Sequence, residues 1–165
     1  MGFFEFKIPV ASPLAIAFAV YTDTAAWQRC TDVTEVRWAG TPWQEGSRMF
    51  IKNNGIVPNA IDQVLLHFER DHRVAYMSHF FGISLETRVT FRALSPHETE
   101  VHIRGEFVGV ASRTFSFAMG SAIESSTRHF VESLNLECER LAAAEIESGL
   151  PPATKAERGK ESIDH

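Results

Sequence analysis

The stretch 115-FSFAMGSAIESSTRHFVESLNLECERLAAAEIES-148 decides the fold, because it predicts one long helix that contains no proline. Placed at 100° per residue, its apolar side chains gather on one stripe, and charged side chains fall opposite. Gly149 and Pro151 follow and predict where the helix ends. Such a helix would run roughly 50 Å, long enough to cross a whole sheet. The predicted stripe consists of Met119, Ile123, Ser126, Phe130, Leu134 and Leu141, and the opposite face of Glu124, Arg128, Glu132, Asn135 and Glu139.

Upstream of this helix, most of the chain alternates apolar and polar residues, as half-buried strands do. Short turns between consecutive strands favour an antiparallel sheet. The sequence therefore predicts an α+β fold in which a curved, seven-stranded antiparallel sheet wraps around the long C-terminal helix. The strands are expected at 2-GFFEFKIPV-10, 33-VTEVRWAG-40, 47-SRMFIKN-53, 84-SLETRVTFRAL-94 and 99-TEVHIRGEFVG-109, with two more inside 60-AIDQVLLHFERDHRVAYMSHF-80.

Two short helices are predicted after the first strand. The first, LAIAFAVY, follows Ser12 as its N-cap and Pro13 at its first position. The second, AAWQRC, follows Thr24 as its N-cap. Both helices precede the second strand, so we expect them to lie at one end of the sheet.

The strand predicted at 60–69 has no clean apolar face. One side carries Gln63 and His67 among apolar residues, and the other carries Asp62. A sheet that lines a ligand cavity can place a few polar groups on its inner face, where they orient the ligand. Alternatively, both faces of this strand are partly wet or meet a partner subunit. The polar residues that could orient a ligand are Gln63, His67, Tyr76 and Ser78.

The composition of the 165 residues fits one soluble domain at 1–149, followed by a polar tail at 150–165 that we expect to be disordered. The 13 phenylalanines suit a large core or an apolar pocket. A net charge of -5 gives non-specific nucleic-acid binding no electrostatic support. We also expect no membrane span and no signal peptide. Two cysteines far apart in the sequence, Cys30 and Cys138, favour the reducing cytoplasm.

The order of these elements resembles the START-like (SRPBCC) superfamily, the helix-grip fold, and within it the polyketide cyclase/dehydrase group. The resemblance covers roughly residues 3 to 145. It is carried by the segments 8-IPVASP-13, 19-AVYTDTAAWQRC-30, 33-VTEVRWAG-40, 45-EGSRMFI-51 and the long helix to Leu141. It implies a deep apolar cavity between the sheet and the long helix, which holds a hydrophobic ligand. A fold of this kind does not by itself indicate whether a protein is a carrier or an enzyme.

The function that the resemblance implies is binding of a hydrophobic small molecule, such as a polyketide or another aromatic metabolite, with cyclisation or dehydration of that molecule as an extension. One alternative is a non-catalytic carrier of a lipid or a quinone. Another is a protein-interaction domain whose cavity is filled by its own phenylalanines. We expect no cofactor and no metal, and a homodimer is a further partner to consider. The residues expected to contact the ligand are Trp27, Trp38, Met49, Ile51, Tyr76, Val89, Phe91, Ile103, Phe107, Met119 and Ile123.

Four residues are candidates for acid–base chemistry. Glu137 is predicted near the centre of the buried helix stripe, and His129 at its edge. Either group could catalyse enolisation and dehydration of a bound ketone. Alternatively, Glu137 pairs with an arginine near the end of the sheet, and His129 donates to a backbone carbonyl. The other two candidates are His67 and Tyr76 on the ambiguous strands. No pair of histidines has the helical spacing of a zinc site.

Overall fold

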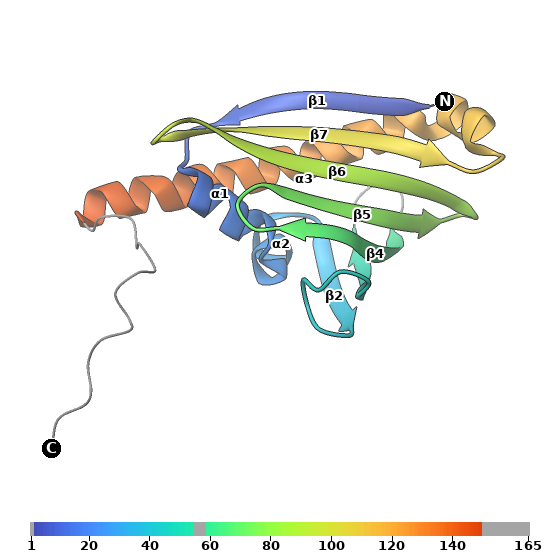
Figure 1. Ribbon diagram of the computed structural model, residues 1–165, viewed down its shortest axis with the longest axis horizontal. Helices are drawn as coiled ribbons and strands as arrows, with labels where there is room; N and C mark the ends of the chain where they lie inside the picture. Colours follow the sequence, from blue (N-terminus) through green and yellow to red (C-terminus); the bar gives the residue numbers. More distant parts are fainter. Residues whose placement is uncertain (1, 55–58, 150–165) are drawn as a thin grey trace, which may run out of the picture.

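The structure is a computed structural model that describes residues 2–54 and 59–149. A seven-stranded antiparallel sheet curves around one long helix, which confirms the predicted helix-grip architecture (Figure 1). The strands lie in the order β1-β7-β6-β5-β4-β3-β2, so the first strand pairs with the last. Their bounds are β1 Phe3–Val10, β2 Val33–Ala39, β3 Arg48–Asn53, β4 Ala60–Glu69, β5 Arg73–Phe80, β6 Ile83–Ser95 and β7 Glu98–Val108.

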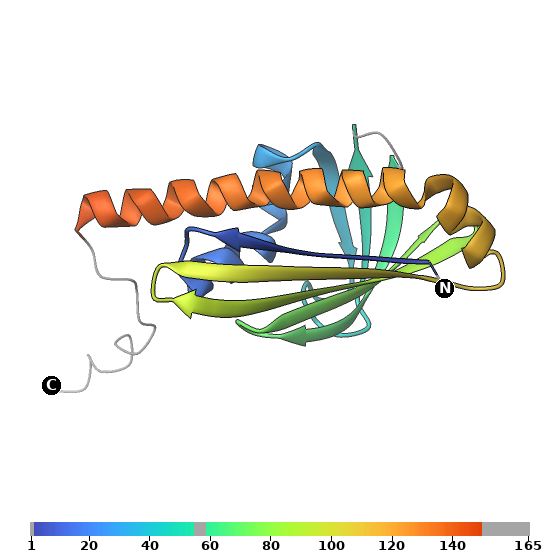
Figure 2. The ribbon, with the colours of Figure 1, turned by 90° about the horizontal axis from the view of Figure 1, so that it is seen from above.

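The long helix α3 spans Ser112–Ser148 and lies across the concave side of the sheet (Figure 2). Its 37 residues give a length of roughly 55 Å. Gly149 ends it with a left-handed backbone at φ 64°, as the sequence predicts. The short helices α1 (Leu14–Tyr21) and α2 (Thr24–Cys30) both lie against α3. Among the described residues, no helix is long and apolar enough to cross a membrane.

The two predicted N-caps are wrong. Pro13, not Ser12, precedes α1, and the carbonyl of Pro13 accepts the first amide bond of the helix. Ser12 is buried instead, and its carbonyl accepts a 2.8 Å hydrogen bond from the Thr99 hydroxyl. Helix α2 begins at Thr24, and Asp23 caps it by accepting from the Ala25 amide at 2.9 Å. In both cases the cap lies one residue away from the prediction.

A β-bulge explains why strand β4 has no clean face. The pairing with β5 shifts between Leu65 and His67, so that one extra residue, Leu66, stands on β4. A bulge of this kind reverses the side on which later residues of the strand point. Phe68 therefore turns inward and packs against Phe18, with ring centroids 5.6 Å apart. His67 turns to the outer face, so simple alternation predicts both residues wrongly.

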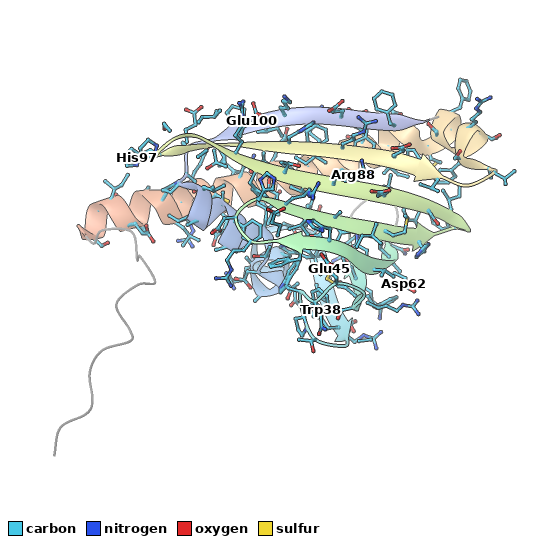
Figure 3. The ribbon with its side chains drawn as sticks, viewed as in Figure 1. Trp38, Glu45, Asp62, Arg88, His97 and Glu100 are labelled. Carbon is cyan, nitrogen blue, oxygen red and sulfur yellow. The ribbon has the colours of Figure 1, made fainter. Side chains whose placement is uncertain are left out.

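The C-terminal half of α3 packs against α1 and the end of β1, where Tyr21 donates to Asn135 and the Ala11 amide donates to Glu139. Val10, Val101, Leu134 and Cys138 are fully buried in this region, which we call the packed half. A dense apolar interior of this kind is the main source of stability in a domain of this size. The outer face of the sheet is charged instead, as Arg88 and Glu100 show in Figure 3.

The buried stripe of α3 is rotated relative to the prediction. Asn135, predicted on the solvent side, is buried, because the hydroxyl of Tyr21 on α1 donates to Asn135 Oδ1 at 2.8 Å. The amide nitrogen of Asn135 is buried without a hydrogen-bond partner. The fully or almost fully buried positions of α3 are Ile123, Val131, Leu134, Asn135, Cys138 and Ala142. The predicted Met119, Ser126, Phe130 and Leu141 are only half-buried.

Gly105 on β7 leaves room for an aromatic ring. It faces Phe4 across the β1–β7 pair, and a Cβ added to Gly105 would lie 2.3 Å from the ring of Phe4. The missing side chain lets the Phe4 ring lie over the strand in the core. The tail predicted to be disordered, 150–165, lies outside the described residues.

Candidate functional site

A cavity of about 460 Å³ lies between α3 and the sheet. Its lining comes from the helical turns of α3 between Ile123 and Val131, and from strands β2 to β7. This volume lies within the usual range of small-molecule sites, roughly 300 to 1,000 Å³. Near the N-terminal end of α3, the ring of Phe115 packs against the rings of Phe80 and Phe107 and fills the space between the helix and the sheet. The cavity is therefore a central chamber between two packed ends.

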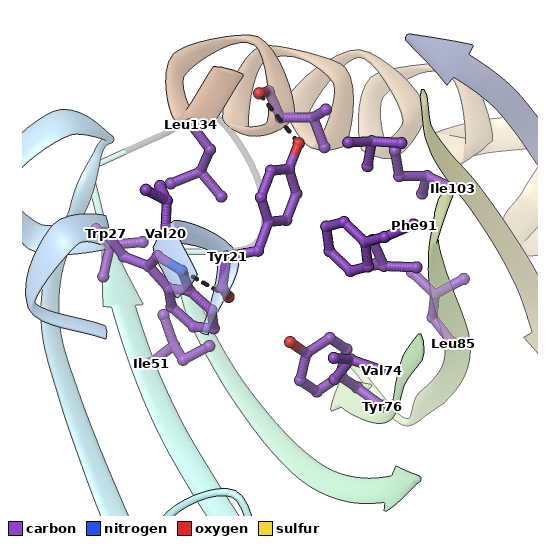
Figure 4. Close-up of a cluster of buried hydrophobic side chains, with 14 of the residues drawn as sticks. Val20, Tyr21, Trp27, Ile51, Val74, Tyr76, Leu85, Phe91, Ile103 and Leu134 are labelled. Carbon is purple, nitrogen blue, oxygen red and sulfur yellow. Dashed lines mark hydrogen bonds between the residues drawn. The ribbon is translucent and has the colours of Figure 1, made fainter. Parts of the chain in front are cut away.

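Six of the eleven residues predicted to contact the ligand line this cavity. Five of them are apolar or aromatic, and the sixth, Tyr76, adds a hydroxyl. Their contact with a ligand stays a prediction. They are Trp27, Ile51, Tyr76, Val89, Ile103 and Ile123, several of which appear in Figure 4.

The other five predicted contacts are packed against protein side chains. Phe91 has ring centroids 5.2 Å from both Phe18 and Tyr21. Phe107 lies between the rings of Phe4 and Phe115. Trp38 packs on Trp43, with centroids 5.1 Å apart, while Met49 is almost fully buried and Met119 packs on the edge of the core. Alternation predicts that these side chains point inward, but it does not predict which of them meet another side chain.

Polar groups from three adjacent strands lie together on the sheet wall of the cavity. Gln63 Nε2 on β4 donates to Ser78 Oγ on β5 at 2.9 Å. Tyr76 on β5 and Thr87 on β6 stand directly opposite each other in the pairing register. All four residues line the cavity. We call these four residues, Gln63, Tyr76, Ser78 and Thr87, the polar wall; such groups in a mostly apolar site can orient a ligand.

The Tyr76 hydroxyl has no hydrogen-bond partner among the described residues, although the ring is buried. Burial raises the pKa of this phenol, so it stays protonated at neutral pH. In Figure 4 the hydroxyl points away from Leu85 and towards the side where Ile51 and Tyr21 lie. A hydroxyl that faces a cavity is available to a ligand or water there, which can supply the missing hydrogen bond.

The open end of the cavity carries an acid–histidine pair. His129 Nε2 on α3 lies 3.4 Å from Asp32 Oδ2, just before β2, and both side chains are more than half exposed. Both residues line the cavity. The exposed Ser125, one turn before His129, lines it as well, so this is where the cavity meets solvent.

Two of the predicted catalytic residues lie away from the cavity lining. His67 contacts Glu45 at 3.0 Å and Glu69 at 3.6 Å on the outer face, because of the bulge in β4. Glu137 accepts hydrogen bonds from Arg140 at 2.8 and 2.9 Å, and these bonds hold the pKa of Glu137 below its usual value. Glu137 is thus held in an arginine pair, but the arginine lies on the same helix and not, as the alternative to catalysis predicted, near the end of the sheet.

Sequence reasoning missed several residues that line the cavity, among them Tyr21, Asp32 and Thr87. Tyr21 lies in an apolar helix segment, and no local pattern indicates that its ring reaches α3. Asp32 lies in the turn before β2, where a carboxylate is an ordinary turn residue. Thr87 does lie on the predicted inward face of β6, so the alternation pattern could have identified it. Within the described part of the chain, no group of three or more His, Cys, Asp or Glu residues could hold a metal ion.

Comparison with known proteins bears on the fold alone. No family model matches the sequence, and no curated protein matches it. Among solved structures, a START superfamily protein from Mycobacterium smegmatis is similar, with a TM-score of 0.66 at 12% identity over 86% of this chain and 99% of that one. An aromatase/cyclase from Streptomyces sp. R1128 has a TM-score of 0.68 at 15% identity over 86% and 96%. Norcoclaurine synthase from Thalictrum flavum has a TM-score of 0.60 at 10% identity over 82% and 94%.

The chain has the START-like helix-grip fold. This agrees with the resemblance that the sequence predicts, and it rests on the shape of almost the whole domain. In a START-like fold, the chamber between the long helix and the sheet is the site to consider first, since a largely apolar concavity with a few polar groups is the usual form of a ligand site.

Proposed function

We propose that this START-like protein binds an apolar small molecule in the chamber between α3 and the sheet. The observation that carries the proposal is the cavity of about 460 Å³, with a Tyr76 hydroxyl on its wall that has no hydrogen-bond partner among the described residues. An interaction domain filled by its own phenylalanines would leave no such space. Among the structures of similar fold is one named as an aromatase/cyclase, so a polyketide-like aromatic is one candidate ligand.

Native mass spectrometry of the purified protein tests this proposal. We expect a fraction of the protein to carry a noncovalent adduct of a few hundred daltons, or to acquire one from an added apolar extract. The control is Ile123→Trp, which places a large ring in the chamber. An adduct that persists in the variant would lie outside the cavity and would contradict the proposal.

A second candidate function is enolisation of a bound ketone, which a cyclase or a dehydratase requires. The observation that favours it is the Asp32–His129 pair at the cavity mouth, together with the protonated phenol of Tyr76 on the wall. His129 would remove a proton next to the ketone while Asp32 stabilises the imidazolium that forms. The Tyr76 hydroxyl would donate a hydrogen bond to the oxygen, where negative charge develops.

The exchange of the acidic protons of 2-tetralone with D₂O, followed by NMR, tests the second candidate. We expect the protein to accelerate exchange, and His129→Gln to reduce the acceleration by about 100-fold or more. If exchange in the presence of protein equals the buffer rate while 2-tetralone is bound, the protein is a carrier. The expected cytoplasmic location and the homodimer stay predictions.

A further inference from the structure

We infer that the cavity selects uncharged molecules with a carbonyl or hydroxyl group, and that this group faces Tyr76 and Thr87 on the polar wall. The inference rests on the proposed function, because it requires a ligand in the chamber. It goes further in stating the charge of the ligand, the kind of polar group and the position of that group. Three features of the lining support it: the absence of Lys and Arg among its described residues, two hydroxyls without a hydrogen-bond partner there, and the apolar side chains around them.

The first feature is the charge of the lining. Among the described residues, the lining contains no Lys and no Arg. Its one histidine, His129, and its one carboxylate, Asp32, lie together at the exposed mouth. A buried carboxylate, sulfonate or phosphate on the ligand would therefore find no counter-charge. An unpaired ion transferred from water to such a site loses several kcal/mol of solvation. The chamber should reject anions.

Lysine and arginine side chains that neighbour the lining residues in the sequence contact other partners, outside the chamber. Lys52 on β3 pairs with Glu35 at 3.3 Å, and Arg88 on β6 pairs with Glu86 at 2.6 Å. Both side chains extend from positions that alternate with the cavity-lining residues of their strands. On α3, the guanidinium of Arg128 stacks over the ring of Phe6, 4.2 Å from its centroid. None of the three lines the chamber.

The second feature is the pair of hydroxyls on the wall. Tyr76 and Thr87 are register partners, so their side chains rise side by side from β5 and β6. Neither hydroxyl has a hydrogen-bond partner among the described residues. A hydroxyl can donate to a carbonyl or accept from another hydroxyl, so either neutral group on a ligand satisfies the pair.

The third feature limits how polar the ligand can be. Ile51, Val89, Ile103 and Ile123 provide apolar walls around the same space. A sugar or another polyhydroxylated molecule would bury several groups there without partners, which is unfavourable. The geometry therefore points to a mainly apolar molecule, such as an aromatic ketone or phenol, with its polar group on the Tyr76 side.

Two fluorescent dyes with the same ring skeleton test the charge. N-phenyl-1-naphthylamine is neutral, and 8-anilinonaphthalene-1-sulfonate adds one sulfonate. We expect the neutral dye to bind saturably with one-to-one stoichiometry, and the sulfonate to bind to the same site at least about tenfold more weakly. Competition between the dyes identifies binding to the same site. If the neutral dye does not bind, the proposed function fails. If both dyes bind the chamber with similar affinity, the proposed function stands and the inference is overturned.

A second matched pair tests the position of the polar group. 2-Acetylnaphthalene and 2-ethylnaphthalene differ mainly by a carbonyl, and each can be titrated against the bound neutral dye. We expect the ketone to bind more tightly, and Tyr76→Phe to lower the ratio of the two affinities by about 3- to 10-fold. Thr87→Val should lower it as well, which provides a second test if one variant folds poorly.

The control variant is Thr90→Val, on the same strand but on the outer face, where Thr90 pairs with Arg73 in the register. This change should leave the ratio unaltered. A ratio that stays constant in both Tyr76→Phe and Thr87→Val would overturn the placement of the polar group on this wall. A ratio that falls equally in Thr90→Val would show a general effect on the sheet and would overturn it too.

Discussion

The two halves of α3 rest on the same sheet but differ in what lies beneath them. Around Leu134 and Cys138, the side chains of α1, β1 and β7 fill the space, and several of them have no exposed surface. Between Ile123 and Val131, the same helix spans a cavity instead. Both segments are amphipathic, so helical periodicity does not separate them. The difference arises from α1, which fills one end of the sheet and stops at Tyr21.

The largest expected effect is a truncation in the packed half. Leu134→Ala should lower the free energy of unfolding by about 2–5 kcal/mol, because the surrounding side chains cannot close the void. Phe130→Ala on the cavity wall should cost less than the roughly 3–5 kcal/mol typical of a core phenylalanine, since part of its ring borders an existing space. Urea unfolding measures both. A larger loss for Phe130→Ala would contradict the contrast between the halves.

Two tyrosines, Tyr21 in the packed half and Tyr76 on the cavity wall, allow the two regions to be compared by removal of one hydroxyl from each. Tyr21→Phe removes the hydrogen bond to Asn135 and leaves that buried amide without any side-chain partner, so we expect a loss of about 1–3 kcal/mol. Tyr76→Phe removes a hydroxyl that has no partner among the described residues, so stability should stay within about 0.5 kcal/mol or rise. The same unfolding experiment compares them. Equal losses would mean that Tyr76 is as firmly bonded as Tyr21.

The smallest expected effect concerns the Glu137–Arg140 pair, on the surface of α3 beside the packed half. Arg140 lowers the pKa of Glu137, so the pair contributes stability above the usual glutamate pKa and loses it as the pH falls through the lowered value. Because Arg140 is mostly exposed, Glu137→Gln should cost only about 0.3–0.5 kcal/mol at pH 7.

The control for Glu137 is Glu132→Gln on the same helix, an exposed glutamate for which the structure shows no ion pair among the described residues. Thermal unfolding at pH 7 should separate the two variants, and the separation should vanish once the pH is well below the lowered pKa of Glu137. A difference that persists at low pH would show that the effect of Glu137 is not the charge pair.

Much of the fold follows from the sequence, because it depends on local periodicity. The seven strands, both short helices and the end of α3 at Gly149 are set by alternation, helical spacing and stop signals. The bulge at Leu66 is different, since an extra residue is recognised only when the partner strand is known. The burial of Asn135 likewise depends on a tyrosine more than a hundred positions earlier in the chain.

The candidate site is less predictable than the fold. Inward-pointing residues such as Val89 and Phe91 carry the same signal in the sequence, yet Val89 lines the cavity while Phe91 packs on α1. Which of two neighbouring positions meets empty space depends on how far α1 extends over the sheet. The reach of α1 over the sheet depends on tertiary packing, so no local pattern in the sequence predicts it.

Insertion of one large ring into each half tests the central claim most directly. Ile123→Trp enters the chamber, and Val101→Trp enters the packed half. The measurement is the binding of N-phenyl-1-naphthylamine, with the free energy of unfolding of each variant determined in parallel. We expect the parent to bind the dye, Ile123→Trp to lose binding at a cost below about 1.5 kcal/mol, and Val101→Trp to lose about 3 kcal/mol or more. A parent that binds no dye, with Ile123→Trp as destabilised as Val101→Trp, would show that the space under α3 is filled and would contradict the account.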